Sequence, residues 1–172
     1  MTTVDLEQQR LLIGPVINDA SRERVLELIE DAKAKGAQVL AGGAADGNVI
    51  APTVLAGVTP EMRIYGEESF GPVVTIVPVE GTDEAVRVAN DTEYGLSASV
   101  FGEDVDAAMT VARRIESGIC HVNSSTVHDE PQMPFGGVKS SGWGRFGGSA
   151  ALHEFTELRW MSVQQTSRHY PI

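Results

Sequence analysis

The chain has 172 residues, 42% of them hydrophobic and 22% charged, which is enough for one domain with a substantial core. Its formal net charge of −11 and its 13 scattered Lys and Arg residues argue against nucleic-acid binding, which needs a basic surface. No apolar run approaches the ~20 residues of a membrane span, no secretory signal begins the chain, and the single cysteine excludes an internal disulfide, so a cytoplasmic protein is predicted.

The first half of the chain predicts a long amphipathic helix followed by extended segments. Asn18 or Asp19 is suited to cap a helix that continues to Lys35, because either side chain accepts hydrogen bonds from the first free N–H groups. A short strand at 38–40 and an extended stretch at 49–58 follow. Apolar residues at helical spacing should form the buried face of the helix: Val25, Leu28, Ile29 and Ala32.

The second half alternates between strands and helices. Strands are predicted at 73–79, 97–101 and 119–122. Between them are two predicted helices, one capped by Thr82 and continuing to about Asn90, the other capped by Asp104 and continuing to Ser117. The first of these strands is apolar at nearly every position, which is typical of a strand buried on both faces. Strands that alternate with helices through short loops predict an α/β fold with a largely parallel sheet and flanking helices.

The last third of the chain is irregular and rich in glycine. Residues 124–148 show little periodicity, and an irregular stretch this long in a compact domain is usually functional or disordered. A short helix is expected at 149–155. Residues 158–165 alternate as a strand does but have no evident partner in this chain.

Three glycines in this region, Gly142, Gly144 and Gly147, have the G-x-G-x-x-G spacing of a dinucleotide-binding loop. Such a loop follows the first strand of a Rossmann unit, opens a helix and precedes an acidic residue by about 20 positions. Here no strand precedes Gly142, and the corresponding later position falls near Ser167. We therefore interpret these glycines as structural, because glycine lets a turn-rich segment lie close to neighbouring backbone.

Four segments, in consistent order and spacing, resemble the NAD(P)-dependent aldehyde dehydrogenase superfamily. They are EESFGPVV at 67–74, NDTEYGLSASVF at 90–101, GICHVN at 118–123 and MPFGGVKSSGWGR at 133–145. The longer stretch TVHDEPQMPFGGVKSSGWGRFGG and the ending RHYPI look most like the branch that acts on aromatic aldehydes, such as vanillin and salicylaldehyde dehydrogenases. The resemblance implies the catalytic-domain fold of that family, an aldehyde substrate, and NAD or NADP as cofactor.

The resemblance also implies roles for four residues. The second glutamate of the E-E-x-F-G-P segment, Glu68, corresponds to the residue that hydrogen-bonds the nicotinamide ribose, and Phe70 to the ring beside it. The loop from Asn123 to Phe135 corresponds to the substrate entrance, with Phe135 a wall of the aldehyde tunnel and His128 at its rim. A local cap or ion pair for Glu68, a core position for Phe70, and a base or metal ligand for His128 stay as alternatives. No metal site is expected, because no second His or Cys lies at ligand spacing.

Cys120 is the only thiol, and members of this family attack the aldehyde carbonyl with a thiolate. The nucleophile of the family lies in a block upstream of every segment matched here, whereas Cys120 falls in an apolar strand, where a buried cysteine is inert. No catalytic residue is therefore expected in this chain. Lys139 and Arg145 could contact phosphate but are expected to be structural.

The resemblance divides the chain into three parts. Residues 1–12 match nothing in the family, 13–157 form the C-terminal portion of the catalytic domain, and 158–172 form its oligomerisation strand and tail. It implies a homo-oligomer that pairs through 158–165; neither nucleic acid nor a membrane is expected as a partner. Because the cofactor domain, the nucleophile, the oxyanion asparagine and the general-base glutamate have no counterpart here, we expect the chain alone not to oxidise aldehydes.

Three functional hypotheses stay open. The first is an enzyme part that is inactive by itself. The second is a small enzyme in which Cys120 acts with His121 or His128. The third is a non-catalytic module that binds a longer related enzyme through its terminal strand. The choice between NAD and NADP also stays open, because in this family it depends on the cofactor domain.

Overall fold

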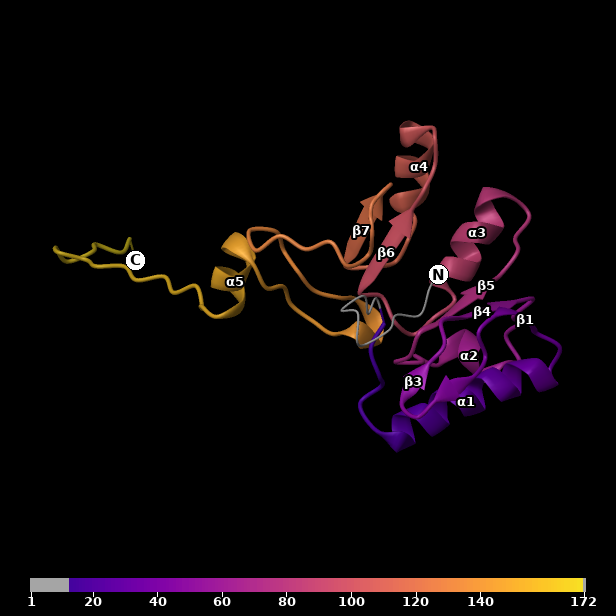
Figure 1. Ribbon diagram of the computed structural model, residues 1–172. Helices are drawn as coiled ribbons and strands as arrows, with labels where there is room; N and C mark the ends of the chain where they lie inside the picture. Colours follow the sequence, from indigo (N-terminus) through magenta and orange to yellow (C-terminus); the bar gives the residue numbers. More distant parts are fainter. Residues whose placement is uncertain (1–12, 172) are drawn as a thin grey trace. The chain divides into compact units, whose positions relative to one another are not determined.

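The computed structural model describes residues 13–171, and its internal contacts separate two compact units on either side of the Ala85–Val86 bond (Figure 1). The segment 1–12, predicted to match nothing in the family, lies outside the described residues. Every helix in the described part of the chain is too short or too polar to cross a membrane.

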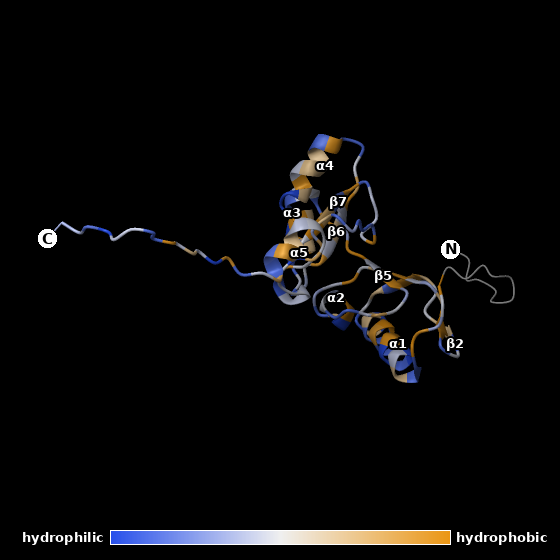
Figure 2. Cartoon of the chain, turned by 90° about the vertical axis from the view of Figure 1, so that its left-hand side faces the viewer, coloured by the Kyte–Doolittle hydropathy of each residue, from blue (hydrophilic) through white to orange (hydrophobic). Residues whose placement is uncertain are grey.

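Helix α1 (Asp19–Ala34) is the longest element of the first unit. Asn18 caps it as predicted, since its side-chain oxygen accepts a hydrogen bond of 2.8 Å from the backbone N–H of Ser21. The helix ends one residue earlier than predicted, with Lys35 as its C-cap. Figure 2 shows both hydrophobic and hydrophilic residues along α1. The predicted inner face is confirmed, because all four of its members are buried: Val25, Leu28, Ile29 and Ala32.

Short strands and one helical turn complete the first unit. In chain order they are β1 (Gln38–Ala41), β2 (Ala45–Asp46), β3 (Val49–Ile50), β4 (Thr53–Ala56), α2 (Arg63–Gly66) and β5 (Val73–Ile76). One sheet has the order β1-β4-β5, in which β1 and β4 are antiparallel and β4 and β5 are parallel, while β2 and β3 form a separate antiparallel pair. The buried face of α1 shares one core with Ile50 of β3 and Leu55 of β4, which are fully buried.

Strand β5 differs from its prediction in length and burial. It ends at Ile76 rather than at residue 79, because β4, its parallel partner, ends at Ala56, which is paired with Ile76. The prediction that this strand is buried on both faces was wrong, because alternate residues are exposed: Val74 is 56% exposed and Ile76 47%. The continuous apolar run therefore does not correspond to two buried faces in this unit.

The second unit contains a strand–helix–strand motif. Strands β6 (Ser97–Val100) and β7 (Ile119–Val122) are parallel and paired from Ser97↔Ile119 to Val100↔Val122, and helix α4 (Val105–Ala112) contacts both. Asp104 caps α4 as predicted, accepting a 3.0 Å hydrogen bond from the Ala107 N–H. The α/β fold with parallel pairs is confirmed; the antiparallel pairs of the first unit were not predicted. Helix α3 (Gly81–Asn90) begins at Gly81, so Thr82 lies inside the helix and the prediction that it caps the helix was wrong. The helix continues across the division between the units.

Helix α4 is five residues shorter than predicted. After Ala112 the backbone bonds tighten, since the N–H groups of Arg114 and Ile115 donate to the carbonyls three residues earlier. The chain must then straighten, because the Gly118 N–H donates to Gly95 O at 2.9 Å at the start of the β6–β7 ladder. The apolar pattern of the sequence therefore continues past Ala112, whereas the helix ends there because the chain has to enter the pairing of β6 with β7.

The C-terminal third follows the irregular pattern predicted for it. It contains a single 3₁₀ turn, η2 (Lys139–Ser141), and helix α5 (Gly148–Glu154) among the described residues. Residues 158–165 are not a strand in the structure, because the described chain offers them no partner for backbone hydrogen bonds. They are exposed throughout, with Trp160 92% exposed. Pairing of this segment with a neighbouring subunit stays a prediction.

Candidate functional site

The four predicted site residues fall in two places. Glu68 and Phe70 lie in the loop between α2 and β5 of the first unit, and His128 and Phe135 line a cleft in the second unit. The two places belong to different units and are described separately.

The loop after α2 presents both predicted cofactor residues to solvent. Glu68 is exposed and takes no part in an ion pair within residues 13–171. Phe70 is 81% exposed and has a φ of +47°, a left-handed conformation that is unfavourable for a bulky residue. A local ion pair for Glu68 and a core position for Phe70 therefore do not occur in this unit. An accessible carboxylate and an accessible aromatic face are the groups that a ribose and a nicotinamide ring require.

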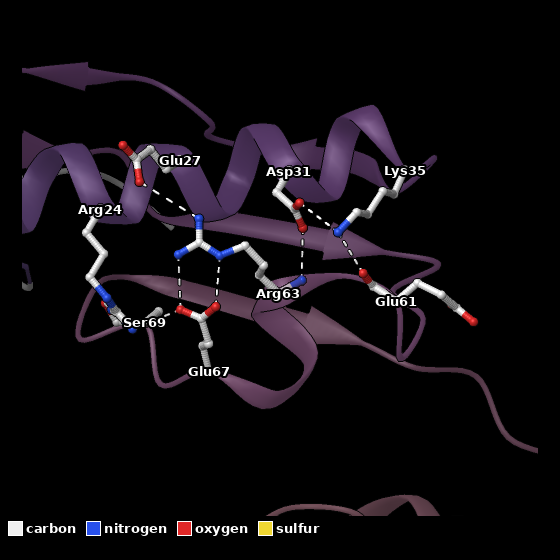
Figure 3. A network of polar contacts seen from close by, with 8 residues as sticks. All are labelled: Arg24, Glu27, Asp31, Lys35, Glu61, Arg63, Glu67 and Ser69. Atoms are coloured by element: carbon white, nitrogen blue, oxygen red, sulfur yellow. Dashed lines mark hydrogen bonds and ion pairs between the residues drawn. The ribbon is translucent and has the colours of Figure 1, made fainter.

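A polar network on α1 and α2 holds this loop (Figure 3). The Arg63 guanidinium donates to both oxygens of Glu67, at 2.8 and 3.1 Å, in the bidentate arrangement that suits a carboxylate. Arg24 donates to the Ser69 carbonyl at 3.0 Å and lies 3.5 Å from Glu67 Oε2. Arg24 therefore contacts the residues on both sides of Glu68, which restrains the backbone that carries it.

The same network shifts the ionisation of its acids. The hydrogen bonds from Arg63 lower the pKa of Glu67 below its ordinary value. Lys35, whose ammonium lies 2.7 Å from Asp31 Oδ1, lowers the pKa of Asp31, and the backbone N–H of Arg63 contributes at 2.9 Å. Both carboxylates are therefore stabilised in their charged form.

The same loop packs closely on α1 at Gly71, two residues after Ser69. A Cβ added to Gly71 would lie 2.7 Å from Cγ2 of Val25, which is a buried member of the α1 face. Any residue larger than glycine would therefore push the loop away from α1. Glycine in the E-E-x-F-G-P segment has a packing reason here.

A cleft of about 360 Å³ in the second unit brings His128 and Phe135 together. The rings of His121 and His128 meet edge-on, with their centroids 5.7 Å apart and their planes at 89°. The Nε2 atom of His128 lies 3.4 Å from Oε1 of Glu130. The lining consists of Gly118, Ile119, Cys120, His121, His128, Asp129, Glu130, Met133, Pro134 and Phe135.

Hydrogen bonds from β6 hold the first part of the cleft loop. Ser99 Oγ donates to Ser124 O at 2.7 Å, and Ser97 Oγ donates to Thr126 O at 3.0 Å. Asn123 has a φ of +54° and ties the turn to Gly102 through two hydrogen bonds, of 2.8 and 2.9 Å. The loop that carries His128 is thus positioned by residues adjacent to β7.

The glycine-rich segment supports the other side of the cleft. The Phe135 N–H donates to Phe146 O at 2.8 Å and its carbonyl accepts from the Phe146 N–H at 2.7 Å. A Cβ on Gly118, the residue before β7, would collide with the Gly136 carbonyl. The two backbones therefore pack directly against each other at this point. The prediction of close backbone packing is confirmed.

Lys139 and Arg145 have their side chains directed to protein groups. Lys139 Nζ donates to the carbonyls of Asn90 and Thr92 and lies 2.7 Å from Glu116 Oε2. Arg145 donates to Gly137 O and Gly144 O at 2.8 and 2.7 Å. These contacts support the structural role expected of both residues.

Cys120 is poorly suited to act as a nucleophile in this unit. Burial raises the pKa of its thiol, and a hydrogen bond involving Ser117 only partly opposes that effect. The thiolate, which is the reactive form, is therefore disfavoured at neutral pH. Among residues 13–171, no three His, Cys, Asp or Glu side chains gather as a metal site would require.

His121 is a cleft residue that sequence analysis did not assign to substrate binding. Its Nε2 atom is buried and has no hydrogen-bond partner among the described residues. A histidine inside the otherwise apolar run Ile119–Val122 was the available signal. The sequence could not show that this nitrogen would be left unpaired at a cleft.

Comparison with known proteins gives consistent matches over nearly the whole chain. The model of the aldehyde dehydrogenase family matches residues 2–161, so it includes most of the segment 1–12 that was predicted to match nothing. A vanillin dehydrogenase from Pseudomonas sp. strain HR199 is 51% identical over 168 residues, which cover 98% of this chain and 35% of that protein. The chain thus spans about a third of the length of the curated relatives it matches.

Solved structures match at the level of fold as well. A salicylaldehyde dehydrogenase from Pseudomonas putida G7, complexed with salicylaldehyde, has a TM-score of 0.89 and 46% identity over 94% of this chain and 34% of its own. A Mycobacterium tuberculosis aldehyde dehydrogenase with NAD+ has a TM-score of 0.81 and 37% identity, covering 86% and 31%. An NADP complex of a Bacillus halodurans glyceraldehyde-3-phosphate dehydrogenase has a TM-score of 0.77 and 41% identity, covering 80% and 29%.

Proposed function

Because the chain belongs to the aldehyde dehydrogenase family, we propose that it forms part of an enzyme that oxidises an aromatic aldehyde to its carboxylate with NAD or NADP. The observation that carries this proposal is the cleft, which unites the two predicted substrate residues, His128 and Phe135, in a chain 51% identical to a vanillin dehydrogenase. Its apolar wall suits an aromatic ring. The single cysteine and the absence of a long apolar run favour the cytoplasm for this reaction.

The residues of the first unit supply cofactor contacts in this proposal. Glu68 would accept hydrogen bonds from the two hydroxyls of the nicotinamide ribose, and Phe70 would limit the positions that the nicotinamide can take. When bound, the cofactor would supply the acceptor for the hydride. Arg24 and Arg63 hold Glu67 and Ser69, so that Glu68 keeps one position when the ribose is bound.

The chain by itself is proposed to be inactive. Its only thiol, Cys120, has a raised pKa and lies in a strand, and hydride transfer requires thiolate, carbonyl and nicotinamide within contact distance. The chain contributes cofactor contacts and a substrate wall, and it associates with like subunits through residues 158–165. The boundary at 157/158 is part of this proposal.

Two assays test the proposed function. NADH formation by the purified 172-residue chain, with vanillin or benzaldehyde and NAD, should be flat in a preparation of verified intact mass. A hybrid in which residues 13–172 replace the matching segment of the Pseudomonas vanillin dehydrogenase should oxidise vanillin. In that hybrid, Glu68→Gln should raise KM for NAD about tenfold, since a hydrogen bond to a charged group is lost.

The matched control is Glu103→Gln, which neutralises an exposed carboxylate outside the candidate site and should leave KM unchanged. A folded hybrid that binds NAD yet oxidises no aldehyde would refute the proposed function. Turnover by the chain alone that disappears in Cys120→Ala would instead support a small enzyme built on Cys120.

The exposed tail favours a second candidate, a non-catalytic module. Leu158, Trp160 and Val163 are strongly exposed, and exposed apolar side chains of this kind mark interaction surfaces. In that case the chain should co-purify with a longer related enzyme, and deletion of 158–172 should abolish the association. Vanillin oxidation by the hybrid would favour the first candidate.

A further inference from the structure

The unpaired nitrogen of His121 is the least explained polar group in the second unit. A buried polar atom without a hydrogen bond is unfavourable. Such an atom in a folded protein needs a hydrogen-bond partner, for example a water, an ion or a ligand. The Nε2 atom of His121 has no partner in the described chain, although its residue lines the cleft. The cleft is open to a ligand that could supply that partner.

The lining of the cleft has two chemically different parts. Ile119, Met133, Pro134 and Phe135 give an apolar wall. His121 and His128 form a polar part, in which the rings meet edge-on and His128 Nε2 faces Glu130 at 3.4 Å. A flat aromatic ring that carries a polar substituent matches both parts at once.

The size of the cleft permits such a ligand. A dry cavity of ~150 Å³ holds benzene, and the cleft has about 360 Å³. A benzene ring with an aldehyde and one or two further substituents therefore fits. A metal ion is not favoured as the occupant, because no three ligand side chains converge within residues 13–171.

A hydroxyl group is the substituent that suits His121 best. A hydroxyl both donates and accepts, so it can pair with Nε2 in either neutral tautomer of the ring. Benzaldehyde has no such group and would leave Nε2 buried and unpaired. A site built for a hydroxyl rejects the analogue that lacks it, because its own polar atom stays unsatisfied.

We propose that His121, assisted by His128, recognises a ring hydroxyl of a hydroxylated aromatic aldehyde in this cleft. The inference rests on the proposed function and adds to it the residue that selects hydroxylated over plain aromatic aldehydes. His128 closes the polar side of the cleft, and Phe135 supplies part of the apolar wall.

The test is a binding titration of the complete 172-residue chain. The probes are benzamide, 2-hydroxybenzamide and 4-hydroxybenzamide, which keep the ring and a carbonyl but form no imine with lysine. NMR gives the dissociation constants and the ¹⁵N shift of His121 Nε2. At least one hydroxylated probe should bind on the order of tenfold more tightly than benzamide, and at saturation it should move the Nε2 signal of His121 farther than benzamide does.

His121→Phe should bind all three probes with similar affinity, because an aromatic ring stays at this position and the polar nitrogen is removed. The matched control is His153→Phe, which changes a histidine of α5 outside the cleft and should preserve the discrimination. The signal of wild-type His121 provides a readout that does not depend on the folding of any variant.

Equal binding of benzamide and both hydroxylated probes would overturn the inference while leaving the proposed oxidation intact. Discrimination that persists in folded His121→Phe would also overturn it. Binding of no probe would refute this cleft as the recognition site, and vanillin oxidation by the hybrid would then still decide the proposed function separately.

Discussion

At the scale of single residues, neighbours in the sequence have different tasks. Glu67 and Glu68 are adjacent carboxylates, yet Glu67 is bound by Arg63 and Arg24, whereas Glu68 stays accessible. The motif alone predicted that Glu68 is the functional one. In the structure, the contacts of Arg24 with Glu67 and Ser69 restrain the backbone on both sides of Glu68.

A glycine at which the structure leaves no space for a side chain also matters at this scale. We predict that Gly118→Ala lowers the free energy of unfolding by about 2–3 kcal/mol, because the new Cβ would collide with the Gly136 carbonyl and neither backbone can retreat easily. Urea unfolding followed by circular dichroism measures the loss. Gly102→Ala is the control, since its Cβ would meet Ala108 at an ordinary 3.4 Å. Equal stability of the two variants would contradict the packing described for β7.

At the scale of elements, the network across α1, α2 and the loop before β5 makes stability depend on pH. The folded-state pKa values of Glu67 and Asp31 lie below their ordinary values of 4.5 and 3.8. Each lowered pKa adds stability that is fully present above the ordinary value and is lost as the pH falls through the folded value. The melting temperature of the first unit should therefore fall as the pH drops from 5 toward and below the lowered values.

Thermal melts in ~0.5-unit pH steps, a spacing fine enough to resolve carboxylate titration, test this expectation. Glu67→Gln and Asp31→Asn should each be less stable than the wild type near neutral pH and should flatten the acid limb. Glu68→Gln is the matched control, because it removes an exposed neighbouring carboxylate that makes no ion pair within residues 13–171. Parallel acid limbs for all four proteins would show that the network contributes nothing.

Elements end where their partners end. Strand β5 stops at Ile76 and α4 at Ala112, although the apolar patterns continue to residues 79 and 117. A hydrogen-bond ladder needs a second strand along its whole length, and a helix must end where the chain has to enter the next strand. The periodicity of a sequence shows neither where a partner strand ends nor where the chain has to enter the next strand.

At the scale of the whole molecule, the exposed tail predicts self-association. Leu158, Trp160, Met161 and Val163 have no cover in the described chain, and burial of such side chains favours association. Sedimentation velocity should show concentration-dependent oligomers of the full chain. Deletion of 158–172 should give a monomer with an unchanged unfolding midpoint, whereas deletion of 166–172 should leave association intact. A full chain that stays monomeric at high concentration would contradict the predicted interface.

Residue type and spacing were sufficient to predict the family, the α/β pattern, the caps at Asn18 and Asp104 and the buried face of α1. These features depend on residues a few positions apart. Three other features became known only from the folded chain: the contact of Arg24 with the loop 45 residues later, the cleft shared by His128 and Phe135, and the unpaired Nε2 atom of His121. Those facts depend on which distant groups meet once the backbone is folded, and local patterns do not encode that.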